Sequence, residues 1–149
     1  MQKNERYLKQ VIVARKDLSM PAGKLAAMVS HAAMTFLAKR MQRVTLDADG
    51  LPSLFEFAPS PEEARWLTEL DDGIEDTGQL SFAKIVLAVD SEEELLTVQS
   101  QARDAGLSVH HVIDSGYSHN KPGTLACIAI GPHWPEQLAP VTGKLKLYR

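Results

Sequence analysis

The sequence lacks the long apolar runs that a membrane helix requires. Its longest apolar stretches, such as residues 11–14 and 85–89, are far shorter than the roughly 20 residues that span a bilayer. The segment MQKNERYLKQ that opens it is polar and has no hydrophobic core of a secretion signal. We therefore expect a cytoplasmic protein with no membrane contact.

Cysteine and the common catalytic motifs are also scarce. Cys127 is the only cysteine, so no disulfide can form within the chain, and its apolar neighbours predict a buried thiol. There is no G-x-S-x-G elbow, no phosphate-binding loop and no dinucleotide glycine fingerprint. His110 and His111 would point to opposite faces of a strand, so we expect no metal site.

Acidic residues are rare at both ends of the chain and abundant in its middle. Residues 1–46 hold nine Lys or Arg against two Asp or Glu, residues 47–104 hold three against fifteen, and residues 105–149 hold four against two. The net charge of −3 therefore hides two basic ends. If the ends meet in the fold, they form a positive face for phosphates; the alternative is that these charges only cover solvated surfaces.

Length and periodicity predict one domain of the α/β class. Apolar runs indicate strands at residues 9–15, 83–89, 108–113 and 125–130, with a last short segment at 145–148. Helices are expected at residues 24–43, 60–70, 91–105 and 135–141. Strands that alternate with helices predict a three-layer α/β/α sandwich.

Local signals mark several boundaries within this pattern. Ser60 with Glu63, and Ser91 with Glu94, have the spacing of capping boxes that begin helices. The Asp49-Gly50 pair between two apolar segments favours a tight turn, so we expect a small hairpin or an ordered loop within residues 44–57. Residues 71–79 are acidic and contain glycine, as in a linker.

Two groups of polar residues are candidates for chemistry. Lys24 and His31 are seven residues apart, so on a helix their directions differ by about 20° and they lie on the same face. The segment DSGYSHNKPGT at 114–124 places a carboxylate, hydroxyl groups, a histidine, an amide and a lysine between two buried strands, where sites commonly form. Each of these residues also has an ordinary structural role, and the pattern alone indicates no reaction.

Several motifs, in order along the chain, resemble those of the second, archaeal and eukaryotic type of peptidyl-tRNA hydrolase. They are KQVIVARKDLSMPAGKLAAMVSHAAMTFL, KIVLAVDSEEELL, DSGYSHNKPGTLACIAIGP and VTGKLKLY. The resemblance covers about two thirds of the chain and leaves residues 44–82 as an insert. It implies a mixed sheet of about four strands flanked by helices, a homodimer and no cofactor.

The resemblance also implies which residues act on the ester that joins a peptide to tRNA. Lys24, His31, Asp114 and Thr124 match motif positions, and Ser118 stands where the family has threonine. Asp114 or His31 would orient or deprotonate the attacking water, while Lys24 and loop groups would stabilise the oxyanion or hold the terminal phosphate. Further candidates for contact with the substrate are Arg15, Lys16, Lys39, Arg40, His119 and Lys121.

Two other functions stay open. The family pattern has glutamine, arginine and glutamine where this chain has Met28, Tyr117 and His119. These differences favour a module on the same fold that binds an RNA end, a nucleotide or a peptide without hydrolysis. Alternatively, the acidic middle segment contacts a basic partner and the pocket has no catalytic role.

Overall fold

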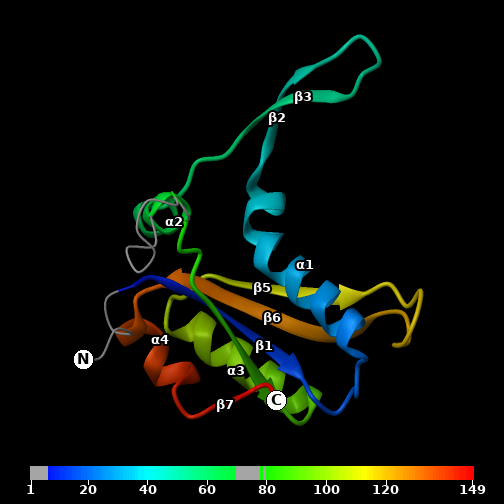
Figure 1. Ribbon diagram of the computed structural model, residues 1–149, viewed down its shortest axis with the longest axis vertical. Helices are drawn as coiled ribbons and strands as arrows, with labels where there is room; N and C mark the ends of the chain where they lie inside the picture. The colour runs from blue at the N-terminus through cyan, green and yellow to red at the C-terminus, as the bar shows by residue number, and fades with distance from the viewer. Residues whose placement is uncertain (1–6, 70–77, 79) are drawn as a thin grey trace.

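A mixed five-stranded sheet forms the centre of the computed structural model, which describes residues 7–69, 78 and 80–149 (Figure 1). The strand order is β5-β6-β1-β4-β7. β1 is parallel to β4 and antiparallel to β6, and β5–β6 and β4–β7 are antiparallel pairs. The strands are β1 (Lys9–Arg15), β4 (Lys84–Val89), β5 (Val109–Asp114), β6 (Thr124–His133) and β7 (Lys146–Leu147). The four strands expected from the apolar runs are confirmed, and the two-residue β7 adds a fifth at the edge.

Helices cover both faces of this sheet, which confirms the three-layer sandwich (Figure 1). α1 (Ala22–Arg40) packs on one face, and α3 (Glu92–Asp104) and α4 (Pro135–Thr142) pack on the other. Alternate residues of β1 point to the two sides: Val11 and Val13 contact the α3 and α4 side, and Ile12 and Ala14 the α1 side. Because both faces of β1 are buried, its sequence is continuously apolar.

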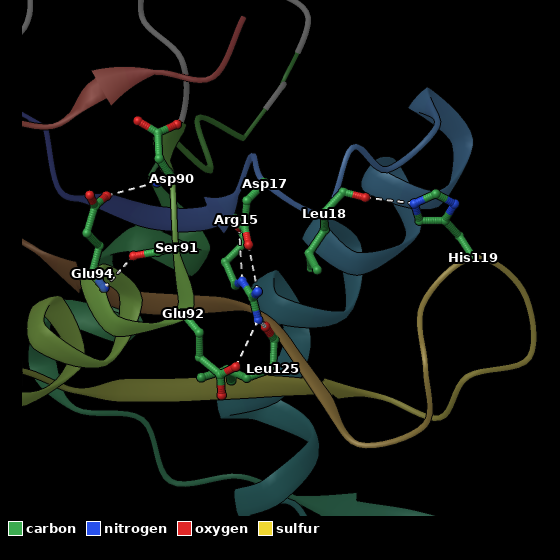
Figure 2. A network of polar contacts seen from close by, with 9 residues as sticks. All are labelled: Arg15, Asp17, Leu18, Asp90, Ser91, Glu92, Glu94, His119 and Leu125. Atoms are coloured by element: carbon green, nitrogen blue, oxygen red, sulfur yellow. Dashed lines mark hydrogen bonds and ion pairs between the residues drawn. The ribbon is translucent and has the colours of Figure 1, made fainter.

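The expected caps begin two helices, although one differs in detail. At α2 (Pro61–Thr68), the Ser60 hydroxyl accepts from the Glu63 N–H and the Glu63 carboxylate accepts from the Ser60 N–H, as predicted. At α3, the Ser91 hydroxyl accepts from the Glu94 N–H, but the Glu94 carboxylate accepts from the N–H of Asp90 instead (Figure 2). The second box is therefore only half formed.

α1 ends earlier than predicted because the chain turns into a strand. Met41 is extended, with ψ at 129°, and β2 (Gln42–Leu46) follows it directly. β2 pairs with β3 (Pro52–Glu56) in a hairpin that projects from the body of the molecule (Figure 1). Gly50 has a φ of +77°, so the expected turn is confirmed, and of the two alternatives the chain forms the hairpin. The linker predicted at 71–79 lies, apart from Gly78, outside the described residues.

Aromatic side chains join α2 to the far end of α1. Phe36 of α1 meets Phe57 and Trp66 edge to face, each with ring centroids 6.0 Å apart, and Trp66 meets Phe82 in the same way. Phe36 and Trp66 are fully buried. This cluster is separate from the two that fill the sheet faces, so it anchors the segment that follows the hairpin.

The single thiol belongs to the core. Cys127 is fully buried on β6, and its Sγ donates to the Met28 carbonyl oxygen at 3.4 Å. Burial raises the pKa of the thiol to about 12, so it stays protonated at neutral pH. This confirms its predicted role as a small hydrophobe. Among the described residues, no helix has the length and apolar content to cross a membrane.

The aromatic cluster gives a first test of the packing. Phe36→Ala is expected to lower the free energy of unfolding by about 3–5 kcal/mol, because it removes a buried ring and leaves a cavity. Urea denaturation of wild type and variant measures this change. Met34→Ala on the same helix is the control, since Met34 is 61% exposed and its loss should cost little. Equal effects of the two substitutions would contradict the assignment of Phe36 to the core.

Candidate active site

A buried ion pair joins the start of α1 to the end of β5. The Lys24 ammonium lies 2.9 Å from Oδ1 and 2.8 Å from Oδ2 of Asp114. The Lys24 side chain is 13% exposed and the Asp114 side chain 2% exposed. The two residues are 90 positions apart in the sequence. The structure thus brings together the two groups that the sequence could only suggest as partners.

The topology of the sheet explains this meeting. β1 and β5 are both antiparallel to β6, so they run in the same direction and their carboxyl ends lie at one edge. The chain leaves β1 at this edge and enters α1, which places Lys24 in the first helical turn. Asp114 is the last residue of β5. Sites of α/β proteins commonly form at such an edge.

Asp114 is held in its ionised form. Its pKa lies below the ordinary value of 3.8, first because Lys24 donates to the carboxylate and then because the Gly116 N–H donates to Oδ1 at 3.1 Å. Burial acts in the opposite direction, and the nearby Asn120 amide lowers the pKa further. At neutral pH the site therefore holds a carboxylate and an ammonium side by side.

Asn120 is a site residue that the sequence did not single out. Its side chain is 9% exposed, and its Nδ2 is buried without a hydrogen-bond partner in the described part of the chain. Asp114 Oδ2 is likewise buried, with the Lys24 ammonium as its one polar contact there. An unsatisfied buried donor is costly, so it points to a role at the site. In the sequence, Asn120 resembles an ordinary turn residue, and only its burial distinguishes it.

The loop between β5 and β6 has a compact backbone. Gly123 N–H donates to the Asp114 carbonyl oxygen at 2.8 Å, and the Thr124 hydroxyl donates to the Lys121 carbonyl oxygen at 2.7 Å. Gly116 has a φ of +82°, and a Cβ there would lie 2.5 Å from the backbone nitrogen of Pro122. Glycine is therefore required at this position by both conformation and space.

His119 ties this loop to the connection between β1 and α1. Its Nε2 donates to the Leu18 carbonyl oxygen at 2.7 Å (Figure 2). The Ser118 side chain is exposed, and among the described residues its hydroxyl makes no hydrogen bond; Tyr117 at the loop tip is 95% exposed. His119 therefore fixes the loop, and Ser118 and Tyr117 face solvent beside the site.

His31 lies on the same helix as Lys24 but further along it. Seven residues at about 1.5 Å each separate the two by about 10 Å along the axis. The His31 side chain is exposed, and its ring makes no hydrogen bond with the described residues. The structure places it at the flank of the Lys24–Asp114 pair rather than in contact with it.

Two of the basic candidates already have acidic partners. The Arg15 guanidinium donates two hydrogen bonds to Asp17 and one each to Glu92 and the Leu125 carbonyl oxygen (Figure 2). Arg40 pairs with Glu63 and donates to the Ala58 carbonyl oxygen.

The other basic candidates remain at the surface. Lys16, Lys39 and Lys121 are exposed and have no ion pair among the described residues. Lys39 and Arg40 lie at the end of α1, about 22 Å of helix from Lys24. Lys16 and Lys121 are nearer to the site along the chain.

Comparison with known proteins gives the family. The model of the family described as peptidyl-tRNA hydrolase PTH2 matches residues 8–148. The peptidyl-tRNA hydrolase of Haloquadratum walsbyi is 36% identical over 141 residues, covering 95% of this chain and 100% of its own. That of Methanocaldococcus jannaschii is 35% identical over 142 residues, covering 94% and 99%. The chain belongs to the peptidyl-tRNA hydrolase PTH2 family.

Among solved structures, a protein of unknown function from Agrobacterium tumefaciens strain C58 has a similar fold. Its TM-score is 0.50 at 14% identity, with 95% of this chain and 97% of the other covered. At that identity the likeness concerns the fold alone. Within this PTH2 chain, Met28 of α1 is 5% exposed, and its side chain packs in the core between the helix and the sheet.

The lowered pKa of Asp114 makes a prediction about stability and pH. A carboxylate whose folded-state pKa is depressed stabilises the fold above its unfolded value, here 3.8, and this contribution disappears as pH falls through the folded value. Asp114→Asn should therefore be less stable than wild type at pH 5–7, and the difference should shrink below about pH 4. Chemical denaturation at a series of pH values measures it. A difference that stays constant down to pH 3 would contradict this account.

The loop glycines give a matched pair of substitutions. Gly116 and Gly123 both have a φ of +82°, but only Gly116 has an atom within 4 Å of its added Cβ. Gly123→Ala should cost about 1–2 kcal/mol from backbone strain alone. Gly116→Ala should cost at least about 1 kcal/mol more, because Pro122 must move. Thermal or urea unfolding compares the two, and equal costs would show that Pro122 does not constrain the loop.

Proposed function

We propose that this PTH2 family member hydrolyses the ester bond between peptide and tRNA in peptidyl-tRNA. The observation that carries the proposal is the buried Lys24–Asp114 pair at the carboxyl edge of the sheet, beside a loop with an unsatisfied amide donor. A carboxylate that is ionised at neutral pH beside an ammonium suits attack of water on an ester. The carboxylate can accept a proton from the water, and the ammonium can stabilise the negative charge that develops on the carbonyl oxygen.

We assign Asp114 to activating the attacking water. Its carboxylate is ionised at neutral pH and accepts a proton as the water oxygen attacks the ester carbonyl carbon. The bond from that carbon to the ribose oxygen then breaks, and the protonated Asp114 gives its proton to that oxygen, which leaves as the ribose hydroxyl. His31 lies about two helical turns from Lys24, so we assign it to orienting the substrate at the flank of the site.

We assign Lys24 to stabilising the negative charge that develops on the ester carbonyl oxygen. An ammonium has three N–H donors; Lys24 donates one to Asp114 Oδ1 and lies 2.8 Å from Oδ2. A remaining N–H can donate to the oxyanion or to the terminal phosphate. As Lys24 shifts toward the substrate, Asp114 loses part of the interaction that lowers its pKa and becomes a better base. Asn120 Nδ2 is an unpaired buried donor in the same loop, and Ser118 and Thr124 supply hydroxyl groups there.

The tRNA backbone requires exposed cations without acidic partners. Lys16 and Lys121 meet this condition near the site, and Lys39 meets it further along α1. We leave Arg15 and Arg40 out of the phosphate contacts, because Asp17, Glu92 and Glu63 already neutralise them. His119 is assigned to fixing the loop through Leu18. Recycling of tRNA in the cytoplasm by a homodimer is the biological setting that we propose with this activity.

A non-hydrolytic binding module is the second candidate. Met28 fills the core and Tyr117 is exposed at the loop tip, so neither supplies the amide or the cation of the family pattern. A site that kept the Lys24–Asp114 pair but lost substrate positioning would bind an RNA end without cleaving it. The decisive difference between the two candidates is release of free tRNA.

The test is hydrolysis of an N-blocked aminoacyl-tRNA by purified protein. We expect wild type to release free tRNA, and Lys24→Ala and Asp114→Asn each to lower kcat by about 100-fold or more, as for loss of a general base or an oxyanion donor. Circular dichroism and thermal unfolding check that both variants fold.

Asp104→Asn is the matched control, since Asp104 is exposed at the end of α3, before β5 begins, whereas Asp114 is at the opposite end of β5. It should hydrolyse at the wild-type rate. Activity that is kept in this control but lost in the Lys24 and Asp114 variants excludes a contaminating hydrolase, which would be unaffected by any of the substitutions. Folded wild type that binds tRNA but releases none would support the binding module and overturn the hydrolase proposal.

A further inference from the structure

Basic residues from two distant parts of the chain line a hollow at the sheet edge. The hollow has a volume of about 630 Å³, and its lining includes Lys16 after β1 together with Lys144, Lys146 and Arg149 around β7. These cations come from the two basic ends of the chain. The charge distribution allowed for a meeting of the two ends, but it could not show which residues meet, because β7 is only two residues long.

These cations are available to a ligand. All four are exposed, and within the described part of the chain none of them makes an ion pair or a side-chain hydrogen bond. Arg15 and Arg40, in contrast, are neutralised by acidic partners. Asp90 is the acidic residue in the lining, so positive charge dominates the hollow. Like charges held close together without partners repel each other, and an anion between them relieves that repulsion.

The hollow lies at the same edge of the sheet as the Lys24–Asp114 pair. β6 sets Ile113 opposite Leu125 and Ala14 opposite Cys127. Asp114 at the end of β5 and Lys16 just after β1 therefore lie at about the same level of the sheet. Only β6 lies between β5 and β1, which corresponds to two strand spacings, or about 10 Å. β7 sets Lys146 opposite Ala88, two further spacings away (Figure 1). A row of phosphates that starts at the site would therefore reach Lys16 first and Lys146 next.

We propose that Lys16, Lys144, Lys146 and Arg149 form a phosphate-binding track for the single-stranded end of the RNA substrate, leading across the sheet edge to the Lys24–Asp114 pair. The inference rests on the proposed function for its choice of RNA. Many proteins that hold single-stranded nucleic acid have a positively charged groove that follows the phosphate backbone, and they depend little on base sequence. The track gives affinity and register, and the chemistry stays at Asp114.

The main alternative track runs along α1 toward Lys39. It has fewer free cations, because Arg40 at that end is paired with Glu63. It also leads away from the edge where Lys16 and β7 lie, since α1 carries Lys39 about 22 Å from Lys24. Charge and position therefore favour the sheet edge.

Binding of fluorescently labelled, uncharged tRNA over a series of salt concentrations tests the track without requiring hydrolysis. Neutralising two of its members, Lys144→Gln with Lys146→Gln, should weaken binding about tenfold at low salt. The slope of log affinity against log salt should fall by about 0.7 for each lost phosphate contact. Asp90→Asn should act in the opposite direction and tighten binding, because it removes a negative charge from the lining.

Arg43→Gln with Arg103→Gln is the matched control, since it removes two exposed positive charges from the hairpin and from α3. It should leave the slope unchanged. Equal losses of affinity in the test and control pairs would show a general charge effect and overturn the track, as would no loss in the test pair. A raised KM with unchanged kcat for Lys144→Gln with Lys146→Gln on N-blocked aminoacyl-tRNA supports it. If wild type binds tRNA through the track but cleaves nothing, the hydrolase proposal fails and the track does not.

Discussion

The functional end of the molecule depends on one desolvated ion pair. Asp114 is almost fully buried at the end of β5, where an uncompensated carboxylate would be strongly destabilising. Lys24 compensates it from the first turn of α1, so helix, strand and loop must keep their relative positions for the pair to form. The Gly116 N–H adds a hydrogen bond that only a tight loop allows. The same contacts that satisfy the buried charge therefore build the site.

This constraint also orders the surface around the pair. It fixes the loop after β5 beside the connection after β1, where His119 donates to the Leu18 carbonyl oxygen. The ends of β1 and β4 and the start of β7 share this edge, so free cations accumulate on one side of the pair. Acidic residues near this edge pair with a buried arginine, as Asp17 and Glu92 do with Arg15. The net negative charge of the chain is thus compatible with a positive track beside the site.

Much of the fold could be predicted from local signals. The apolar run of β1 is buried on both faces, and the Ser60–Glu63 box depends on residues three positions apart. Signals of this kind need only neighbours in sequence. The sequence could not show that Glu94 caps the N–H of Asp90, because several donors lie within its reach. Likewise, Asn120 resembles a turn residue until its burial and its unpaired Nδ2 are known.

The sequence by itself determined the class of fold, the helix starts, the family motifs and the two groups of polar residues, because periodicity, caps and motif order are properties of neighbouring residues. Only the tertiary structure decided which charges meet. Lys24 and Asp114 come together across 90 positions, Arg15 is neutralised by Glu92 across 77, and Lys16 joins the cations around β7. Strand order and direction set these pairings. Burial makes them important for stability, because a charge that is removed from water destabilises the fold unless a partner lies beside it.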